Sequence, residues 1–479
     1  MTKVINIKKG LDINLIGKAP KEFLCLAKAA NFAVVPDHYV GITPKVIVCA
    51  GDRVKAGTQL MVDKAHPEIK IVSPVSGEVT DVHRGEKRKI LSVTIQPDEH
   101  IEYVQFDVNG LKCADTKAQM DADNEAGQLK ALLLESGLWP FIKQRPYDRV
   151  AIPSETPRDI FVTAHFSAPL APDFAFIVAG EEKEFLKGLN VLSMLTPGKV
   201  YLGVKGGASF HRDCSGHADE TPFHHDFSDN IEVVELYGPH PVGNVGVMIN
   251  LAKPVNKGET VWTLNAADVV LIGRFFLKGT VDFTRIVALT GSGMEVRGYV
   301  KVIAGCTIDS ILQGKIKSAS KKGDRNLRYI DGNVLTGAHI GMDDYLSPYS
   351  NQLTVIPEGD DVDEFLGWAM PGLRKYSVNR SYFTWLLGKN IEYDVDARIR
   401  GGKRAMIMSN EYDKVFPMDI LPEYLLKAII TFDIEKMENL GIYEVAPEDF
   451  ALCEFVDTSK IEIQKIVREG LDLLYKEMN

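Results

Sequence analysis

The sequence contains no closely spaced pair of cysteines. Its six cysteines are scattered along 479 residues, and the two nearest in sequence are Cys25 and Cys49. A cysteine-built iron–sulfur cluster or zinc site needs at least one close pair, so we expect no such site and no metal in this chain. The simplest interpretation is a set of small buried thiols in a reducing cytosol.

Long apolar runs are also missing. No uncharged stretch approaches the roughly 18 residues that would indicate a spanning helix. The run at residues 269–272, for example, stops at Arg274, and the first ten residues contain no apolar segment of the kind found in secretory signals. We therefore expect no transmembrane segment, so that any membrane association uses a partner or a surface patch.

Positive charge is in deficit. Lys and Arg total 55 against 65 Asp and Glu, giving a net charge of −10. This balance argues against nucleic acid as the main partner, because phosphate binding requires a concentrated cationic surface. The composition is 45% apolar and 25% charged, as in ordinary globular proteins, and the length predicts about three domains.

The pattern of expected elements changes along the chain. Residues 1–100 show short strands between Gly and Pro turns, which is typical of a small barrel or sandwich. Residues 101–257 begin with a polar connection and then alternate buried strands with helices, which predicts a mostly parallel α/β layer. The expected strands of that layer are residues 160–164, 175–179, 200–204 and 231–236. Residues 258–315 contain a compact β unit, and residues 316–479 a β-rich connector followed by a helical tail.

The sharpest local signal is GDRVKAG at residues 51–57, followed by DKA at 63–65 and SPVSGEV at 73–79. This segment resembles the barrel of lipoyl and biotinyl carrier domains, in which a modified lysine stands at a hairpin tip. The functional interpretation makes Lys64 an attachment site. We favour an unmodified barrel, because the spacing from Gly51 to Lys64 is short and Pro67 interrupts the hairpin.

A second candidate is a polar segment at residues 209–230, which is rich in histidine. Imidazole and thiolate groups are good zinc ligands, and the segment contains His211, Cys214, His217, His224 and His225. However, it has almost no apolar anchors, and such a run is usually a solvated loop. We favour the loop.

Several longer stretches form a recognisable set. They are IKKGLDINLIGKAP (7–20), DKAHPEIKIVSPVSGEV (63–79), ESGLWPFIKQRP (135–146), IFVTAHFSAPLAPD (160–173), GPHPVGNVG (238–246), TVWTLNAADVVLIG (260–273) and FPMDILPEYLL (416–426). Together they resemble one family from end to end: the A subunit of the sodium-translocating NADH:quinone reductase. That family is related to the C subunit of the ferredoxin:NAD complex and to the flavin-carrying, NADH-binding subunit of respiratory complex I.

The resemblance implies a fold and a setting. The fold is α+β and multidomain, with a lipoyl-like barrel-sandwich at residues 1–100, a flavin-domain-like α/β unit at 101–257, a β-grasp unit at 258–315 and a connector with a helical domain at 316–479. The setting is the cytoplasmic side of the bacterial inner membrane. There, a peripheral subunit docks on the membrane subunits of a six-subunit complex that oxidises NADH on another subunit, reduces ubiquinone or menaquinone and exports sodium.

One departure from the flavin-binding relatives bears on cofactors. Those relatives hold the flavin phosphate on a glycine-dense loop before a helix. Here the corresponding residues, 135–148, contain one glycine, Gly137, and bulky side chains that include Trp139 and Phe141. The helical tail has only Cys453, where the relatives have clustered cysteines. We therefore expect no cofactor in this chain, with flavins and an iron–sulfur cluster on other subunits of the complex.

The sequence leaves the catalytic residues unknown and two roles open. In one role the chain contributes to quinone binding, with Trp139, Phe141 and His165 as candidate contacts, because a quinone ring needs aromatic walls and a donor such as imidazole. In the other, the chain is a structural docking subunit and these rings pack as core. A third and weaker alternative is a carrier protein acylated at Lys64.

Overall fold

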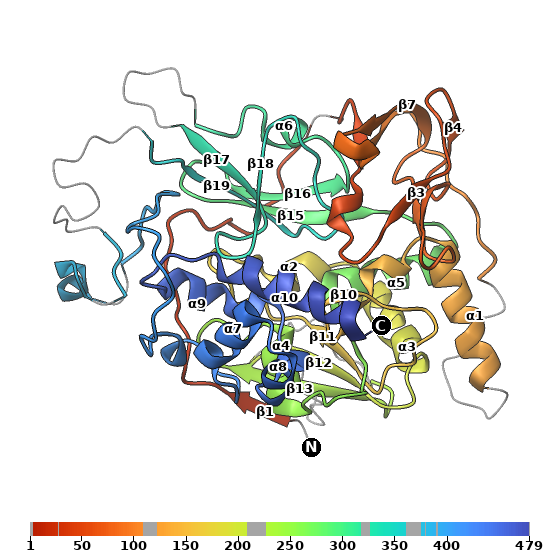
Figure 1. The fold of residues 1–479 in the computed structure, drawn as a ribbon. Coiled ribbons are helices and arrows are strands. Elements are labelled where there is room, and N and C mark those ends of the chain that lie inside the picture. The colour runs from red at the N-terminus through yellow and green to blue at the C-terminus, as the bar shows by residue number, and fades with distance from the viewer. Residues whose placement is uncertain are drawn as a thin grey trace, which may run out of the picture.

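The structure is a computed structural model in which residues 3–26, 28–108, 122–207, 227–317, 326–360, 375–378, 380–388 and 391–478 are described. Within those residues the strands form four sheets, of seven, five, four and three strands. Figure 1 shows a small β unit beside the five-stranded sheet, and below both of them the seven-stranded sheet with its helices. The chain is thus α+β and multidomain, as expected.

The two smaller sheets form the N-terminal barrel-sandwich. All of their strand pairings are antiparallel. One sheet has the order β2 (Phe32–Val34), β8 (Ile90–Pro97), β7 (Gly77–Arg84), β4 (Arg53–Val54), and the other β3 (Pro44–Val46), β5 (Gln59–Asp63), β6 (Lys70–Val72). A Cβ atom at Gly77 would lie 2.0 Å from the carbonyl oxygen of Gln96, so only glycine fits this crossing. The barrel or sandwich expected for this part of the chain is confirmed.

The seven-stranded sheet is the α/β layer. Its first five strands are parallel neighbours, and its last two pair antiparallel at one edge. The order is β1 (Lys3–Asn6), β13 (Ile231–Tyr237), β12 (Val200–Lys205), β11 (Ile160–Thr163), β14 (Val261–Asn265), β9 (Lys143–Arg145), β10 (Arg149–Val150). Its helices include α1 (Ala122–Glu135), α2 (Phe174–Val178), α3 (Glu182–Met194), α4 (Val245–Ala252) and α5 (Ala266–Lys278).

Two expectations about this layer differ from the structure. The expected strand at residues 175–179 is wrong, because residues 175–178 lie in α2 and Asp173 caps that helix by accepting a hydrogen bond from Phe176 N–H. In addition, β1 comes from the segment assigned to the barrel but pairs with β13, where Ile5 is opposite Leu236. A short apolar run has no periodicity that separates strand from buried helix.

The unit expected at residues 258–315 is also divided differently. Its first part, β14 and α5, belongs to the seven-stranded sheet, and α5 packs closely on α3: a Cβ atom at Gly273 would lie 1.6 Å from the carbonyl oxygen of Glu184. Its second part joins strands from beyond residue 316 in one five-stranded sheet. The order is β16 (Gly298–Ile303), β15 (Thr284–Thr290), β19 (Gln352–Pro357), β17 (Leu327–Asp331), β18 (Ala338–Ile340), with α6 (Ile308–Leu312) following β16.

The C-terminal helices cover one face of the α/β layer (Figure 1). They are α7 (Pro422–Thr431), α8 (Ile434–Asn439), α9 (Ala451–Val456) and α10 (Ile463–Met478), and the helical tail is confirmed. Apolar side chains of β1, β13 and α4 share one buried cluster with them, including Ile5, Met248, Leu425 and Leu471. None of the helices in the described ranges is both long enough and apolar enough to cross a bilayer.

The cysteines only partly match the expectation of buried thiols. Cys306 and Cys453 are buried, whereas Cys25 and Cys49 are exposed in loops of the N-terminal part. The remaining two, Cys113 and Cys214, lie outside the described residues.

Candidate functional site

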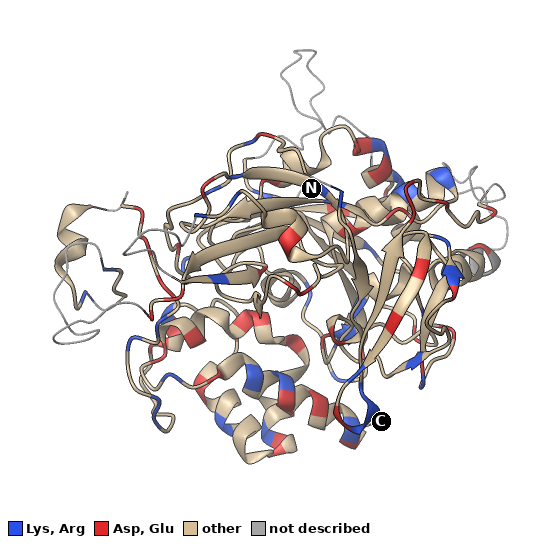
Figure 2. Cartoon of the chain, turned by 90° about the horizontal axis from the view of Figure 1, so that it is seen from above, with Lys and Arg blue, Asp and Glu red and all other residues tan. Residues whose placement is uncertain are grey.

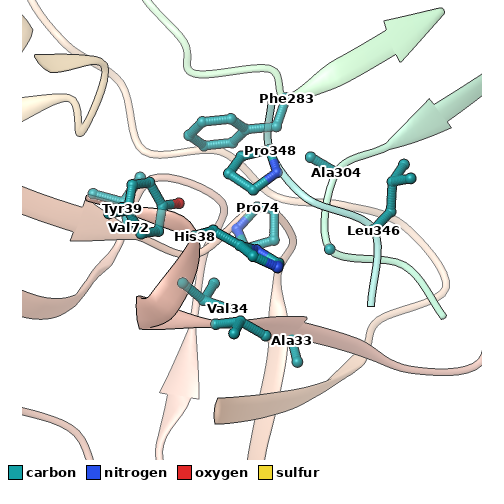
Figure 3. Close-up of a pocket in the computed structure, with 12 residues that line it drawn as sticks. Ala33, Val34, His38, Tyr39, Val72, Pro74, Phe283, Ala304, Leu346 and Pro348 are labelled. Atoms are coloured by element: carbon teal, nitrogen blue, oxygen red, sulfur yellow. The ribbon is translucent and has the colours of Figure 1, made fainter. Parts of the chain in front are cut away.

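The barrel-sandwich and the five-stranded sheet enclose a pocket between them (Figure 3). Protein atoms leave about 310 Å³ unfilled here, but this figure includes open solvent, and the enclosed part of the pocket has room for about one water molecule. The two units meet closely here, because Ala33 N–H donates a 2.8 Å hydrogen bond to the carbonyl oxygen of Gly305. A Cβ atom at Gly305 would lie 2.5 Å from the carbonyl oxygen of Ala33.

The pocket walls are mostly apolar. The barrel-sandwich contributes Ala33, Val34, Val35, His38, Tyr39, Val72 and Pro74, and the other unit contributes Phe283, Ala304, Gly305, Leu346 and Pro348. Figure 3 shows Phe283 on one side and the rings of His38 and Tyr39 on the other. Concave, apolar and aromatic walls with a few polar groups are typical of small-molecule sites.

The two polar groups of the pocket are electrically neutral near pH 7. Burial lowers the pKa of His38, although the nearby carboxylates of Asp37 and Asp344 oppose this shift. Burial raises the pKa of Tyr39, so its phenol stays protonated. His38 is at the end of a short 3-10 helix (Pro36–His38), and Tyr39 follows it. A neutral imidazole and a phenol can each donate one hydrogen bond to an acceptor in the pocket.

Phe141 lies directly behind this pocket. Its ring is 6.1 Å from the ring of Phe283 and 5.3 Å from that of Tyr349, which in turn is 5.9 Å from the ring of Tyr39. The Tyr349 hydroxyl donates a 2.7 Å hydrogen bond to the carbonyl oxygen of Pro140. Phe141 is 2% exposed, so it supports the pocket wall from inside the core.

Trp139 is part of the core of the α/β layer. It is fully buried, its Nε1–H donates a 2.7 Å hydrogen bond to the carbonyl oxygen of Ala151, and its ring packs edge-on against Trp262 at 5.2 Å. Trp139 and Phe141 share one 3-10 helix (Trp139–Phe141). Residues 139–141 are therefore occupied by packed rings.

His165 occupies a different place in the fold. It follows β11, near the carboxyl end of the parallel strands, whereas the Trp262 partner of Trp139 pairs with Ile160 at the beginning of β11. Burial, followed by the charge of Lys205, lowers the pKa of His165 to about 4. The structure thus brings Phe141 to the pocket and does not bring His165 together with the two rings.

A second histidine, His240, lies near His165. Burial, followed by the proximity of His165, lowers its pKa to about 4. Ser167 Oγ accepts a 2.9 Å hydrogen bond from Gly243 N–H and lies 2.9 Å from His240 Nδ1, so its own proton can be donated to that nitrogen. This arrangement assigns the ring proton to His240 Nε2, a buried atom that has no hydrogen-bond partner among the described residues.

Sequence reasoning missed His38, Tyr39 and Phe283. Pro36, His38 and Tyr39 belong to a segment whose pattern indicates only a barrel, and Phe283 precedes a strand of another sheet. The only local signal is the pair of ring-bearing residues after Pro36. What makes them a site is the contact between two domains, which no spacing within one segment reveals.

The histidine-rich segment and Lys64 are the two other candidates from the sequence. The histidine-rich residues 209–226 lie outside the described residues, and among those described no group of three His, Cys, Asp or Glu is placed to hold a metal ion. Lys64 is exposed just after β5, and its backbone N–H donates a 2.8 Å hydrogen bond to the carbonyl oxygen of Thr43.

Three family models match the chain. They are described as the NqrA N-terminal barrel-sandwich hybrid domain, at residues 5–98, the NqrA second alpha/beta domain, at 124–281, and the NQRA C-terminal domain, at 286–341. The second match includes β14 and α5, in agreement with the seven-stranded sheet.

Full-length relatives carry one name. The chain is 34% identical over 477 residues to the protein of Neisseria meningitidis serogroup C that is named as the A subunit of the Na(+)-translocating NADH-quinone reductase, covering 99% of this chain and 100% of the relative. It is 34% identical over 478 residues to the protein of the same name from Vibrio vulnificus, with the same coverage.

Solved structures add little. Two structures of an NAD+-reducing [NiFe]-hydrogenase, in the H2-reduced and air-oxidised states, align with TM-scores of 0.28 and 0.31 at 9% and 10% identity. They cover 43% and 50% of this chain and 41% and 47% of theirs, and such scores support no statement about the fold. The family models and the full-length identity carry the assignment: the chain belongs to the NqrA family, the A subunits of the Na(+)-translocating NADH-quinone reductase.

Proposed function

We propose that this chain is a peripheral subunit of a bacterial sodium-pumping NADH:quinone oxidoreductase and supports quinone reduction coupled to sodium export. The observation that carries the proposal is the identity of 34% along the whole length of relatives with that name. In this proposal the chain docks on the membrane subunits at the cytoplasmic side of the inner membrane, and the isolated chain is inactive.

Within the complex, we propose that the quinone head group binds at the solvent-open mouth of the pocket between the barrel-sandwich and the five-stranded sheet. A quinone head group is a flat apolar ring with two carbonyl acceptors. The pocket offers aromatic walls in Phe283 and Tyr39 and neutral donors in His38 and Tyr39. Because both donors are uncharged near pH 7, they can bind carbonyl oxygens without the cost of burying a charge. Phe141 fixes the wall from behind.

Quinone contact by Trp139 and His165 stays a prediction, and the same experiments test it. The full burial of Trp139 and its ring contact with Trp262 support a packing role. The competing role for the whole chain is structural docking without quinone contact, and the weaker one is a carrier acylated at Lys64. A mass spectrum of the natively expressed chain tests the carrier role directly, since an acyl group adds a fixed mass.

We also propose that the chain carries no flavin and no iron–sulfur cluster of its own, and that these groups are on other subunits. In this view the flavin-domain-like unit expected at residues 101–257 has packed rings in place of a phosphate loop, and a β-grasp unit lies within the expected residues 258–315, where β15 and β16 pair. Support comes from Trp139 and Phe141, which fill the stretch where the relatives' backbone approaches a phosphate. A flavin absorbance that survives gel filtration of the chain would contradict this.

The experiment that tests the main proposal is co-purification from native membranes with identification of the subunits. We expect the chain to elute with membrane subunits in a complex that has sodium-stimulated NADH:quinone reductase activity. Recovery of the chain alone, with the activity in other fractions, would contradict the proposal. Equilibrium titration of the purified chain with a short-chain ubiquinone then separates quinone binding from a purely structural role.

A further inference from the structure

One short helix in the second half of the chain presents its large apolar side chains to solvent. It is the 3-10 helix Phe383–Leu387, called here the aromatic tip. Phe383 is 64% exposed, Trp385 48%, Leu386 62% and Leu387 58%. Scattered single apolar residues are common on protein surfaces, but four in one five-residue helix form a patch that needs a partner.

The orientation of the aromatic tip is fixed by its one buried member. Thr384 is 2% exposed, and its hydroxyl donates a 2.7 Å hydrogen bond to the carbonyl oxygen of Lys375. The threonine therefore faces inward while its neighbours face outward. The stretch of chain next to the tip is anchored by Tyr376, whose ring is 5.0 Å from that of Tyr393 and 5.7 Å from that of Phe455 in α9.

The tip projects from the body of the molecule. Figure 1 shows it as the blue helix at the far left, beyond the C-terminal helices, and Figure 2 shows it at the same side with Lys and Arg next to it. Its apolar side chains are thus held away from the chain's own core.

The charge around the tip is opposite to that of the whole chain. In the described residues 375–378 and 380–388 the charged side chains are Lys375 and Arg380, both positive, in a chain whose net charge is −10. The Arg380 guanidinium lies 5.3 Å from the centre of the Trp385 ring, and Lys375 Nζ lies 5.6 Å from that of Tyr382. One cation is therefore held against the exposed ring of Trp385 and another against the half-buried ring of Tyr382.

We propose that the aromatic tip inserts into the headgroup region of an anionic lipid bilayer. Trp and Phe favour the membrane–water interface, and adjacent Lys and Arg are attracted by acidic headgroups. A protein groove would have to supply acids for these cations, whereas an anionic bilayer offers negative charge in every direction. The inference deepens the proposed function, on which it rests for the presence of a membrane, by naming the surface that meets the lipid.

Vesicle co-sedimentation of the full purified chain tests this. We expect binding to vesicles of phosphatidylcholine with phosphatidylglycerol, weaker binding to phosphatidylcholine alone, and loss of binding at high salt. The double variant Phe383→Ser/Leu386→Ser should lower the partition coefficient about tenfold. The matched control is Tyr424→Ser/Ile430→Ser, which removes side chains that are 56% and 52% exposed on α7 and should bind like the wild type.

A depth measurement gives an independent readout. The chain has four tryptophans, and in a Trp368→Phe background only Trp385 is exposed, because Trp139 and Trp262 are buried. Brominated lipids should quench part of the tryptophan fluorescence of this bound variant, and the further change Trp385→Phe should abolish that quenching.

Two results would overturn the inference: absence of vesicle binding, or equal binding by both double variants. Binding that appears only when the membrane subunits are present would overturn it too, in favour of a protein groove. These assays use no quinone and no NADH. A negative result would therefore reject the membrane contact without deciding the proposed function.

Discussion

The carboxylate of Asp268 accepts a 2.7 Å hydrogen bond from Arg285 Nη1, and both side chains are almost fully buried, at 4% and 2% exposure. Asp268 is in the first turn of α5 and Arg285 in β15, so the pair joins the α/β layer to the five-stranded sheet. Arg285 also donates to the carbonyl oxygen of Ser350 and to Asn351 Oδ1. This pair therefore fixes the five-stranded sheet, which carries one wall of the pocket, relative to the α/β layer.

Breaking this ion pair from one side should be costly. Arg285→Met leaves the Asp268 carboxylate buried without its partner, and we expect the free energy of unfolding to fall by about 3–5 kcal/mol. Urea unfolding followed by circular dichroism measures it. The double variant Asp268→Asn/Arg285→Met removes both charges and should lose less than the single one. Equal losses in the two variants would mean that the charge pairing is not the cause.

We expect His240 to make the folded chain less stable in acid. Its pKa is about 4 in the folded chain, against an ordinary value of 6.5, because burial disfavours the imidazolium. As the pH falls below 6.5 the unfolded chain takes up this proton first, so the stability present above pH 6.5 is lost towards pH 4. His240→Asn, which keeps an acceptor for Ser167, should flatten this slope in urea titrations at several pH values. An unchanged slope would contradict the assignment.

For Glu448 we expect the opposite dependence of stability on pH. Although 43% of its side chain is exposed, desolvation by the surrounding protein, followed by the neighbouring Asp449, raises its pKa to about 7, while Arg145 attracts the charged form. Between pH 4.5 and 7 the unfolded chain loses this proton while the folded chain keeps it, so the group's contribution to stability falls as pH rises. Glu448→Gln should therefore gain stability relative to the wild type from about pH 5 to pH 8. The thermal midpoint measures this, and a gain in the acidic range only would refute it.

A substitution of Trp139 distinguishes a packing role of this side chain from a role in quinone contact. Trp139→Leu should lower the free energy of unfolding by about 2–4 kcal/mol, because it empties space in a closed core and removes the bond to Ala151. Where the complex still assembles, we expect the KM for quinone to stay at the wild-type value. A raised KM in this variant, or in His165→Ala, would restore these residues to the quinone site.

Lys64 should be dispensable. It is exposed after β5, so Lys64→Ala should change stability by roughly 0.5 kcal/mol at most and leave assembly intact. Loss of quinone reductase activity in an assembled Lys64→Ala complex would reopen the carrier interpretation.

The parts of the fold that sequence predicts well are those whose patterns are local. Residues 160–164 and 231–236 are buried parallel strands because continuous apolar runs between turns have few alternatives. The run at 175–179 could not be told from a strand by its pattern, since only the cap at Asp173 marks most of it as a helix. The division at residue 258 is wrong because strand pairing between β14 and β11 is a long-range contact that local patterns do not contain.

The candidate site is predictable only in its chemistry. Aromatic walls and an imidazole donor follow from the needs of a quinone ring, and Phe141 does lie against the pocket wall. Tyr39 and Phe283, however, are far apart in sequence and meet only because two domains close on each other. Phe141 is singled out because the family resemblance implies a glycine-dense loop at residues 135–148, whereas nothing of that kind marks Tyr39 or Phe283.

The KM for quinone in the assembled complex tests the central claim most directly. Phe283→Leu and Tyr39→Phe should each raise this KM about three- to tenfold, by loss of a ring wall or of one hydrogen bond, while NADH oxidation by an artificial acceptor is unchanged. The matched control is Phe275→Leu, a buried ring of α5 that does not line the pocket, and its KM should equal the wild-type value. Wild-type quinone kinetics in both pocket variants, with normal assembly, would contradict the account and favour a purely structural subunit.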